Sequence, residues 1–145
     1  MRFLFATRTD FAALVARVAL GAVMFPHGAQ KLLGWFGGYG YSATMQYFAQ
    51  QGFPAALSFL AIVAEFFGAI GLIIGFLGRI AAFGIGCVMA VAVATVHYQV
   101  GFFMNWGGTQ KGEGFEYHIL ALALALVVII KGSGALSVDR ALSGR

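Results

Sequence analysis

Seven ionisable side chains lie in or beside the apolar stretches of this sequence. They are Arg17, His27, Lys31, Glu65, His97, Glu116 and His118. A charged side chain at the centre of a membrane costs about 2.5–3.5 kcal/mol on insertion scales, so such groups are expected to face a bundle interior and to pair. At 100° per residue, Arg17 lies about 40° from Lys31 around a helix, and Lys31 lies one turn from His27. One stripe of the first apolar stretch is therefore basic.

This set of donors suits the binding of an anion or of the carbonyl oxygens of a quinone, which need polar groups at the end of an apolar slot. We expect Arg17, Lys31 and the histidines to act as donors, and Glu65 to act as a charge partner or proton acceptor. Arg17 and Glu65 are expected to pair across neighbouring helices, either as a structural clamp or as part of the site. Glu116 and His118 lie about 200° apart on an ideal helix, so one of them faces the interior.

Other kinds of site find little support. No HxxxH, ExxH or HxH pattern occurs, so the sequence predicts no metal site. The single cysteine, Cys87, excludes an internal disulfide or CxxC pair, and its apolar surroundings predict a buried small side chain. The scattered basic residues form no stripe for a phosphate backbone, so nucleic acid is not an expected partner.

The elements that hold these residues follow from composition. Of 145 residues, 61% are hydrophobic and 10% are charged, whereas soluble domains have about 25% charged residues. A soluble monomer is thereby excluded. A spanning helix needs about 20 mostly apolar residues, and such runs occur at about 11–33, 54–77, 79–100 and 115–131. The sequence predicts an all-α membrane four-helix bundle, a single transmembrane domain over residues 1–145.

Topology follows from the distribution of Lys and Arg. Six of them flank the spans on one side and two on the other, so the positive-inside rule predicts that both termini are cytoplasmic. The loops at 34–53 and 101–114 then face outward, and five of the seven candidate residues, all but Arg17 and Glu65, lie near that outer face. Small residues, including a GxxxG pair at Gly71 and Gly75, are expected to bring helices close together.

The charged positions and glycines together resemble the DoxX family of small four-span membrane proteins. That group includes the DoxD-like subunit of thiosulfate:quinone oxidoreductase. The matching stretches are ARVALGAVMFPHGAQKLLG, AEFFGAIGLIIGFLGRIAA, VHYQVGFFMNWGG, GFEYHILALALAL and GSGALSVDR. The resemblance implies a membrane protein associated with redox chemistry, as a partner subunit coupled to quinone or to the handling of sulfur compounds and oxidative stress.

The leading hypothesis is a multi-pass protein of the plasma or inner membrane, a DoxX-type subunit of a quinone-linked oxidoreductase. Its polar cluster in the outer leaflet would bind a quinone head group or a small oxyanion. The alternative is a non-catalytic scaffold or accessory subunit that docks to a larger membrane complex through its aromatic loops. A conduit for protons or small solutes ranks last, because no inverted repeat supports it. Lipid and either a partner subunit or a second copy are the expected contacts.

Overall fold

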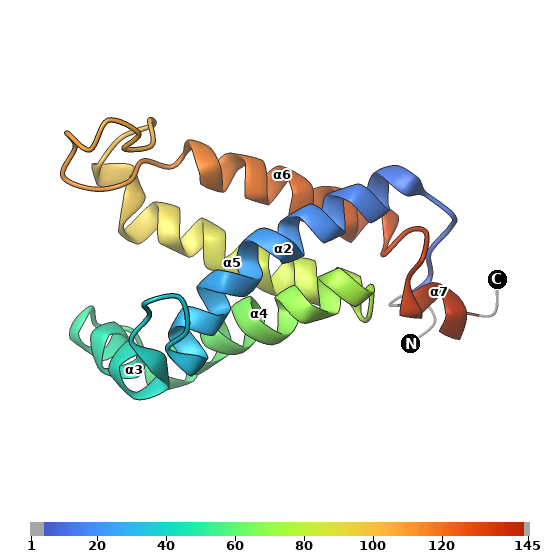
Figure 1. Cartoon of the computed structure of the whole chain (residues 1–145), viewed down its shortest axis with the longest axis horizontal. Coiled ribbons are helices and arrows are strands. Elements are labelled where there is room, and N and C mark those ends of the chain that lie inside the picture. The colour runs from blue at the N-terminus through green and yellow to red at the C-terminus, as the bar shows by residue number, and fades with distance from the viewer. Residues whose placement is uncertain (1–4, 144–145) are drawn as a thin grey trace.

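The computed structural model describes residues 5–143, and every regular element in that range is a helix (Figure 1). Three helices are long and apolar enough to cross a membrane. They are α2 (Phe11–Leu33), α4 (Ala55–Ile74) and α5 (Gly78–Thr95). The remaining elements are α3 (Gly40–Gln50), the 3-10 turn η1 (His97–Gln99), α6 (Glu116–Lys131) and the short α7 (Val138–Leu142).

Helix α6 packs in the bundle against α5 and α2 (Figure 1). It has 16 residues and is therefore about 24 Å long, shorter than the ~30 Å of hydrocarbon in a typical bilayer. Its sequence is nonetheless apolar from Ile119 to Ile130. The fourth span therefore stays a prediction.

The structure differs from the sequence prediction at the end of α4 and in the first loop. Helix α4 ends at Ile74 because Gly75 takes a left-handed conformation, with φ 73°, which glycine adopts without strain. Residues 40–50, expected as loop, form α3, where good helix formers such as Ala43, Met45 and Gln46 outweigh the flanking glycines.

Close contact between α2 and α4 depends on two glycines of α2. A Cβ on Gly28 would lie 2.6 Å from the backbone of Phe66, and a Cβ on Gly21 would lie 2.8 Å from the carbonyl oxygen of Ala69. The expected GxxxG pair acts differently, since Gly75 caps α4 and lies against Ser137 and the guanidinium of Arg17, not against the backbone of another helix. Small residues thus fix how far α2 and α4 are displaced along each other.

The core between the helices is built from small and aliphatic side chains, and much of the outer surface is apolar as well. Leu20, Leu72, Ile85 and Val128 are fully buried in that core. Exposed large side chains lie around the outside of all four long helices, including Phe59, Phe83 and Leu120. The expectation that Cys87 is buried was wrong, because it lies on the exposed face of α5. In a membrane this surface faces lipid.

The two ends of the bundle differ. Helix α3 and the 101–114 loop lie at one end, and α7 lies at the other together with the segment that precedes α2 (Figure 1). The chain on either side of the bundle is tied together there, because Gly134 N donates to Thr7 Oγ1 and Lys131 Nζ lies 2.6 Å from Asp10 Oδ2. We call this the terminal end, and the opposite one the loop end.

Candidate functional site

Arg17 does not pair with Glu65. Its guanidinium lies at the terminal end, and all five of its N–H donors bond to backbone carbonyl oxygens. Those oxygens belong to the last turn of α4 and to the segment before α7, namely Leu72, Ile73, Ser133, Ala135 and Leu136. Arg17 is 1% exposed and has no donor left for a ligand. The sequence-based pairing, and the role of Arg17 as a ligand donor in its present geometry, are therefore corrected.

The reason is the displacement of α4 along α2. The prediction placed Arg17 and Glu65 within reach of each other on neighbouring helices. In the structure Gly28 lies against Glu65 and Phe66, and Arg17, three turns further along α2, is level with the end of α4. The last carbonyls of a helix have no partner within it, so a cation there is favourable. Glu65, seven residues before Leu72, is about 10 Å away along the axis.

The carboxylate of Asp139 also holds the terminal end together, and we call Arg17, Asp139 and their hydrogen-bond partners the terminal lock. In the sequence, the only signal for Asp139 was its place in the matching stretch GSGALSVDR. Its carboxylate accepts hydrogen bonds from the backbone amides of Leu77 and Gly78, which begin α5, and from the hydroxyl of Ser133 at 2.5 Å. It is 1% exposed. Arg17 and Asp139 thus fasten the same C-terminal segment to two different helices, which gives both residues a structural role.

Lys31 and Glu65 form the ion pair of the loop end. Lys31 Nζ lies 2.5 Å from Glu65 Oε2, and the Glu65 side chain is 4% exposed whereas that of Lys31 is 28% exposed. A charge-assisted bond of this length compensates a carboxylate that is buried in the bundle. The pair carries no net charge when both groups are ionised.

Three histidines and a tyrosine lie close together at the same end. The His97 and His118 rings lie 4.1 Å apart between centroids, and Tyr117 lies 5.3 Å from His118 and 6.4 Å from His27. These residues come from α2, from η1 and from α6, so only the tertiary structure brings them together. We call His27, Lys31, Glu65, His97, Tyr117 and His118 the polar cluster.

His118 has an unsatisfied hydrogen-bonding atom. Its side chain is 5% exposed, and its buried Nδ1 has no partner within the described part of the chain. A buried polar nitrogen without a partner is uncommon in folded proteins and costs about 1–3 kcal/mol. Its neighbour Tyr117 is also weakly satisfied, because the hydroxyl reaches only the sulfur of Met24, at 3.4 Å.

The remaining candidates are engaged in shaping the adjacent loop. Glu116 accepts hydrogen bonds from Met104 N at 2.9 Å and from Trp106 Nε1 at 3.2 Å, and so it points away from the cluster. His97 Nδ1 lies 2.8 Å from the carbonyl oxygen of Glu113, to which it donates. As the helical phase predicts, His118 faces the interior and Glu116 does not.

The cluster combines hydrogen-bond donors with apolar walls. The rings of Phe25 and Phe66, which is next to Glu65, lie 5.6 Å apart between centroids and are tilted by 31° to each other. Tyr117, absent from the sequence-based candidates, belongs to the site, and its position next to Glu116 was the available signal. No three metal-ligating side chains converge anywhere in residues 5–143. Neutral donors beside an ion pair can hold a polar, uncharged group.

The DoxX family model matches residues 12–98, more than half of the chain. The chain belongs to the DoxX family. It is 30% identical over 135 residues to the inner membrane protein YphA of Escherichia coli K12, covering 88% of this chain and 87% of YphA. Inner membrane protein YqjF of the same bacterium is 29% identical over 135 residues, covering 92% of this chain and 94% of YqjF.

A third relative is "Putative oxidoreductase CatD" of Bacillus subtilis 168, 25% identical over 130 residues, covering 90% of this chain and 86% of CatD. No solved structure matches the chain significantly. Family membership, the two inner membrane relatives and the three apolar helices make this DoxX protein a multi-pass protein of the inner membrane.

Proposed function

We propose that this chain is a DoxX-type subunit of a membrane redox complex and that its polar cluster binds the head group of a quinone. The observation that carries the proposal is the buried Nδ1 of His118, which has no partner among the described residues. A quinone carbonyl oxygen accepts a hydrogen bond and so would satisfy that nitrogen. The nearby hydroxyl of Tyr117 is a second donor, because its present acceptor is a weak one.

A quinone fits the charges better than an oxyanion does. The cation of Lys31 is matched by Glu65, and the donors of Arg17 are all engaged at the other end of the bundle. A small anion would therefore enter a site with little net positive charge, and no favourable interaction would offset the free-energy cost of its desolvation. A neutral ring with two carbonyl groups meets no such penalty, and the apolar walls favour it.

The proposal includes four spans with both termini cytoplasmic. The described residues at the terminal end carry five cationic side chains against two carboxylates, and those at the loop end carry two against three. The positive-inside rule then places the terminal end in the cytoplasm and the polar cluster in the outer leaflet. Cytoplasmic and periplasmic reporters fused to either terminus test this arrangement, and activity of a periplasmic reporter would contradict it.

Three residues of the polar cluster and two neighbouring phenylalanines then have definite roles. His118 and Tyr117 hold the two polar edges of the head group, while Phe25 and Phe66 cover its face. When bound, a quinone supplies an acceptor for two electrons and two protons. His97, next to His118 and bonded to the exposed loop, holds a proton between the site and water. Electrons would come from a partner subunit, consistent with the name oxidoreductase given to the relative CatD.

Direct binding tests the proposal. The purified protein in nanodiscs is titrated with a short-chain ubiquinone or menaquinone, and binding is followed by the quenching of its intrinsic fluorescence. We expect His118→Leu to weaken binding about tenfold, and Tyr117→Phe somewhat less, since each removes one hydrogen bond of about 0.5–1.5 kcal/mol. Tyr98→Phe is the matched control, because Tyr98 is 71% exposed at the same end. Equal affinities in all variants would reject the site.

The scaffold alternative keeps one supporting observation. Glu116 fixes the 101–114 loop through Met104 N and Trp106 Nε1, and the loop presents Trp106 with 88% of its surface exposed. An ordered, exposed tryptophan is typical of an interface. If Trp106→Ala releases a stoichiometric partner in native mass spectrometry and His118→Leu changes nothing, the chain acts as a scaffold.

A further inference from the structure

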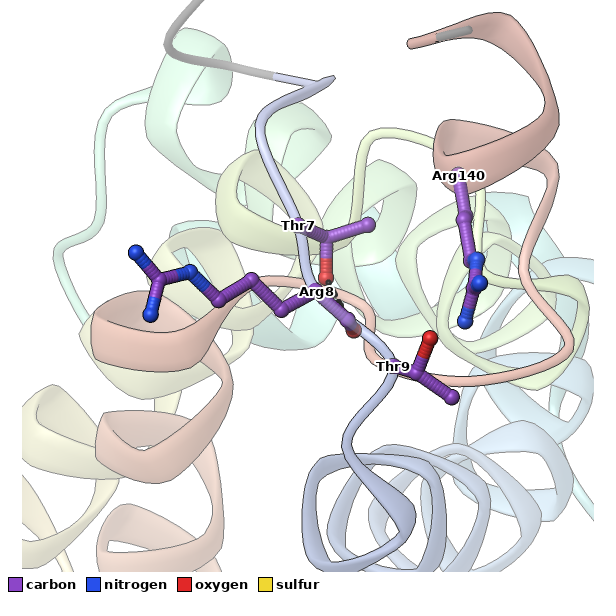
Figure 2. A pocket seen from close by; sticks show the side chains of 4 residues that line it. All are labelled: Thr7, Arg8, Thr9 and Arg140. Atoms are coloured by element: carbon purple, nitrogen blue, oxygen red, sulfur yellow. Dashed lines mark hydrogen bonds between the residues drawn. The ribbon is translucent and has the colours of Figure 1, made fainter. Parts of the chain in front are cut away.

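The terminal end of the molecule holds a cavity that the proposed quinone site does not use. The cavity has a volume of about 250 Å³ and is lined by Thr7, Arg8, Thr9 and Arg140 (Figure 2). It lies between the segment that precedes α2 and the short helix α7. The Thr9 hydroxyl and the Arg140 side chain point toward each other, whereas the side chain of Arg8 extends away from Arg140 (Figure 2).

The described residues at the end of the bundle that holds this cavity carry more cationic than anionic side chains. Asp10 accepts from Lys131 Nζ and from Ala13 N. Asp139 is buried and accepts from Ser133 and from the first amides of α5. The described residues of the terminal end therefore carry an excess of three positive charges over their carboxylates.

Three exposed apolar residues flank the lining residues along the chain, and we call Phe11, Leu136 and Leu142 the apolar rim. Phe11, two residues after Thr9, is 66% exposed. On the other side Leu136 is 80% exposed and Leu142, two residues after Arg140, is 62% exposed. Exposed apolar side chains next to basic ones are typical of segments that lie in the boundary between lipid head groups and acyl chains. The cavity also lies just before the first residue of the spanning helix α2.

We propose that this cavity binds the phosphate group of an anionic phospholipid, which is independent of the proposed quinone site. Arg140 and Thr9 bond the phosphate oxygens, and Arg8 adds to the positive field at the membrane surface. The cavity is smaller than the pockets that enclose a whole drug-sized ligand, so it takes a head group while the acyl chains stay in the bilayer. Free phosphate would make the same hydrogen bonds, but it has no acyl chain to contact the apolar rim.

The test compares lipids on the full-length protein. Delipidated protein receives phosphatidylglycerol or phosphatidylcholine in detergent, and native mass spectrometry measures the bound fraction of each. We expect preferential binding of phosphatidylglycerol. Arg140→Gln should weaken that binding at least about tenfold, because it removes a charged hydrogen-bond donor, and Thr9→Val, which removes a neutral donor, should weaken it less. Lys111→Gln, which removes a cation at the loop end, is the matched control and should bind as the wild type does.

Three outcomes would overturn the proposal. The two lipids could bind equally, the Lys111→Gln variant could lose as much affinity as Arg140→Gln, or millimolar inorganic phosphate could displace phosphatidylglycerol completely. The last result would assign the cavity to a free anion. Circular dichroism of each variant shows whether it is folded, and Thr9→Val, which changes no charge, keeps the test valid if Arg140→Gln does not fold.

Discussion

Replacing Arg17 by lysine or by methionine distinguishes the contribution of its hydrogen bonds to stability from that of its charge. Lysine keeps the positive charge but offers three N–H donors instead of five, so at least two of the five carbonyl oxygens lose their partner. Hydrogen bonds between helices inside membranes contribute about 0.6 kcal/mol on average, so two lost bonds cost about 1 kcal/mol and five cost about 3 kcal/mol. Bonds to charged groups of about 1.5–3 kcal/mol would raise the first figure to about 3–6 kcal/mol.

We therefore expect Arg17→Lys to lower the free energy of unfolding by about 1–6 kcal/mol and Arg17→Met to lower it further, by at least about 3 kcal/mol. The ordering is informative, because methionine removes a charge from the membrane and would make insertion itself easier. The loss thus reports folding of the inserted helices rather than insertion.

The assay is reversible unfolding in mixed micelles with increasing dodecyl sulfate, followed by circular dichroism. Amide hydrogen exchange should rise in residues 133–139 before it rises in the spanning helices, because Arg17 holds that segment through three of its carbonyl oxygens. Lys111→Met is the control, since it removes an exposed cation from the loop end. If Arg17→Met unfolds like the wild type, the terminal lock contributes nothing to stability.

Three further predictions concern packing, charge and pH. Gly28→Ala should lower the free energy of unfolding by about 1–3 kcal/mol, since the new Cβ would lie 2.6 Å from the backbone of Phe66. Gly86→Ala is the control and should not, because the atom nearest to its Cβ would be 3.9 Å away. Equal losses in the two variants would contradict this prediction. Lys31→Met should lower the free energy of unfolding by about 3–5 kcal/mol, because it leaves the buried carboxylate of Glu65 without a partner. In a double-mutant cycle, adding Glu65→Gln should recover most of that loss. Additive losses would argue against the ion pair. The hydrogen bond from Lys131, together with one from a backbone amide, lowers the pKa of Asp10 below its usual 3.8. The ionised carboxylate of Asp10 therefore contributes to stability above about pH 4, and this contribution is lost as the pH falls through the pKa of the folded state. Asp10→Asn, which keeps an N-cap residue, should remove this pH dependence of the thermal midpoint; a variant that retains it would place the titration elsewhere.

The spanning helices could be predicted because the signal for them is local. A run of about 20 apolar residues must be a helix in lipid, where every backbone polar group needs an internal partner. Helix ends were less predictable, since Gly75 ends α4 through a backbone conformation, whereas the same apolar pattern continues to Leu77. Helix α3 was missed because it is short, and its neighbouring glycines and aromatic residues resemble a loop.

The candidate site was predictable in its residue types and not in its pairs. Charges that interrupt apolar spans must find partners, and that reasoning grouped Lys31 with His118 at one end of the bundle but left Glu65 outside that group. It gave Glu65 the wrong partner. Arg17 is nearly on the same face of α2 as Lys31, so the phase of the helix alone does not distinguish them.

The sequence by itself determined that this protein lies in a membrane, that it is helical, that it belongs to the DoxX family, and which ionisable side chains interrupt its apolar spans. Only the tertiary structure decided which of them meet. The displacement of α4 along α2 is set by the close contact of Gly21 and Gly28 with the α4 backbone, and it brings Lys31 to Glu65 and Arg17 to the end of α4. Such displacement depends on packing between segments that are distant in the sequence, and the residue pattern along one helix does not specify that packing.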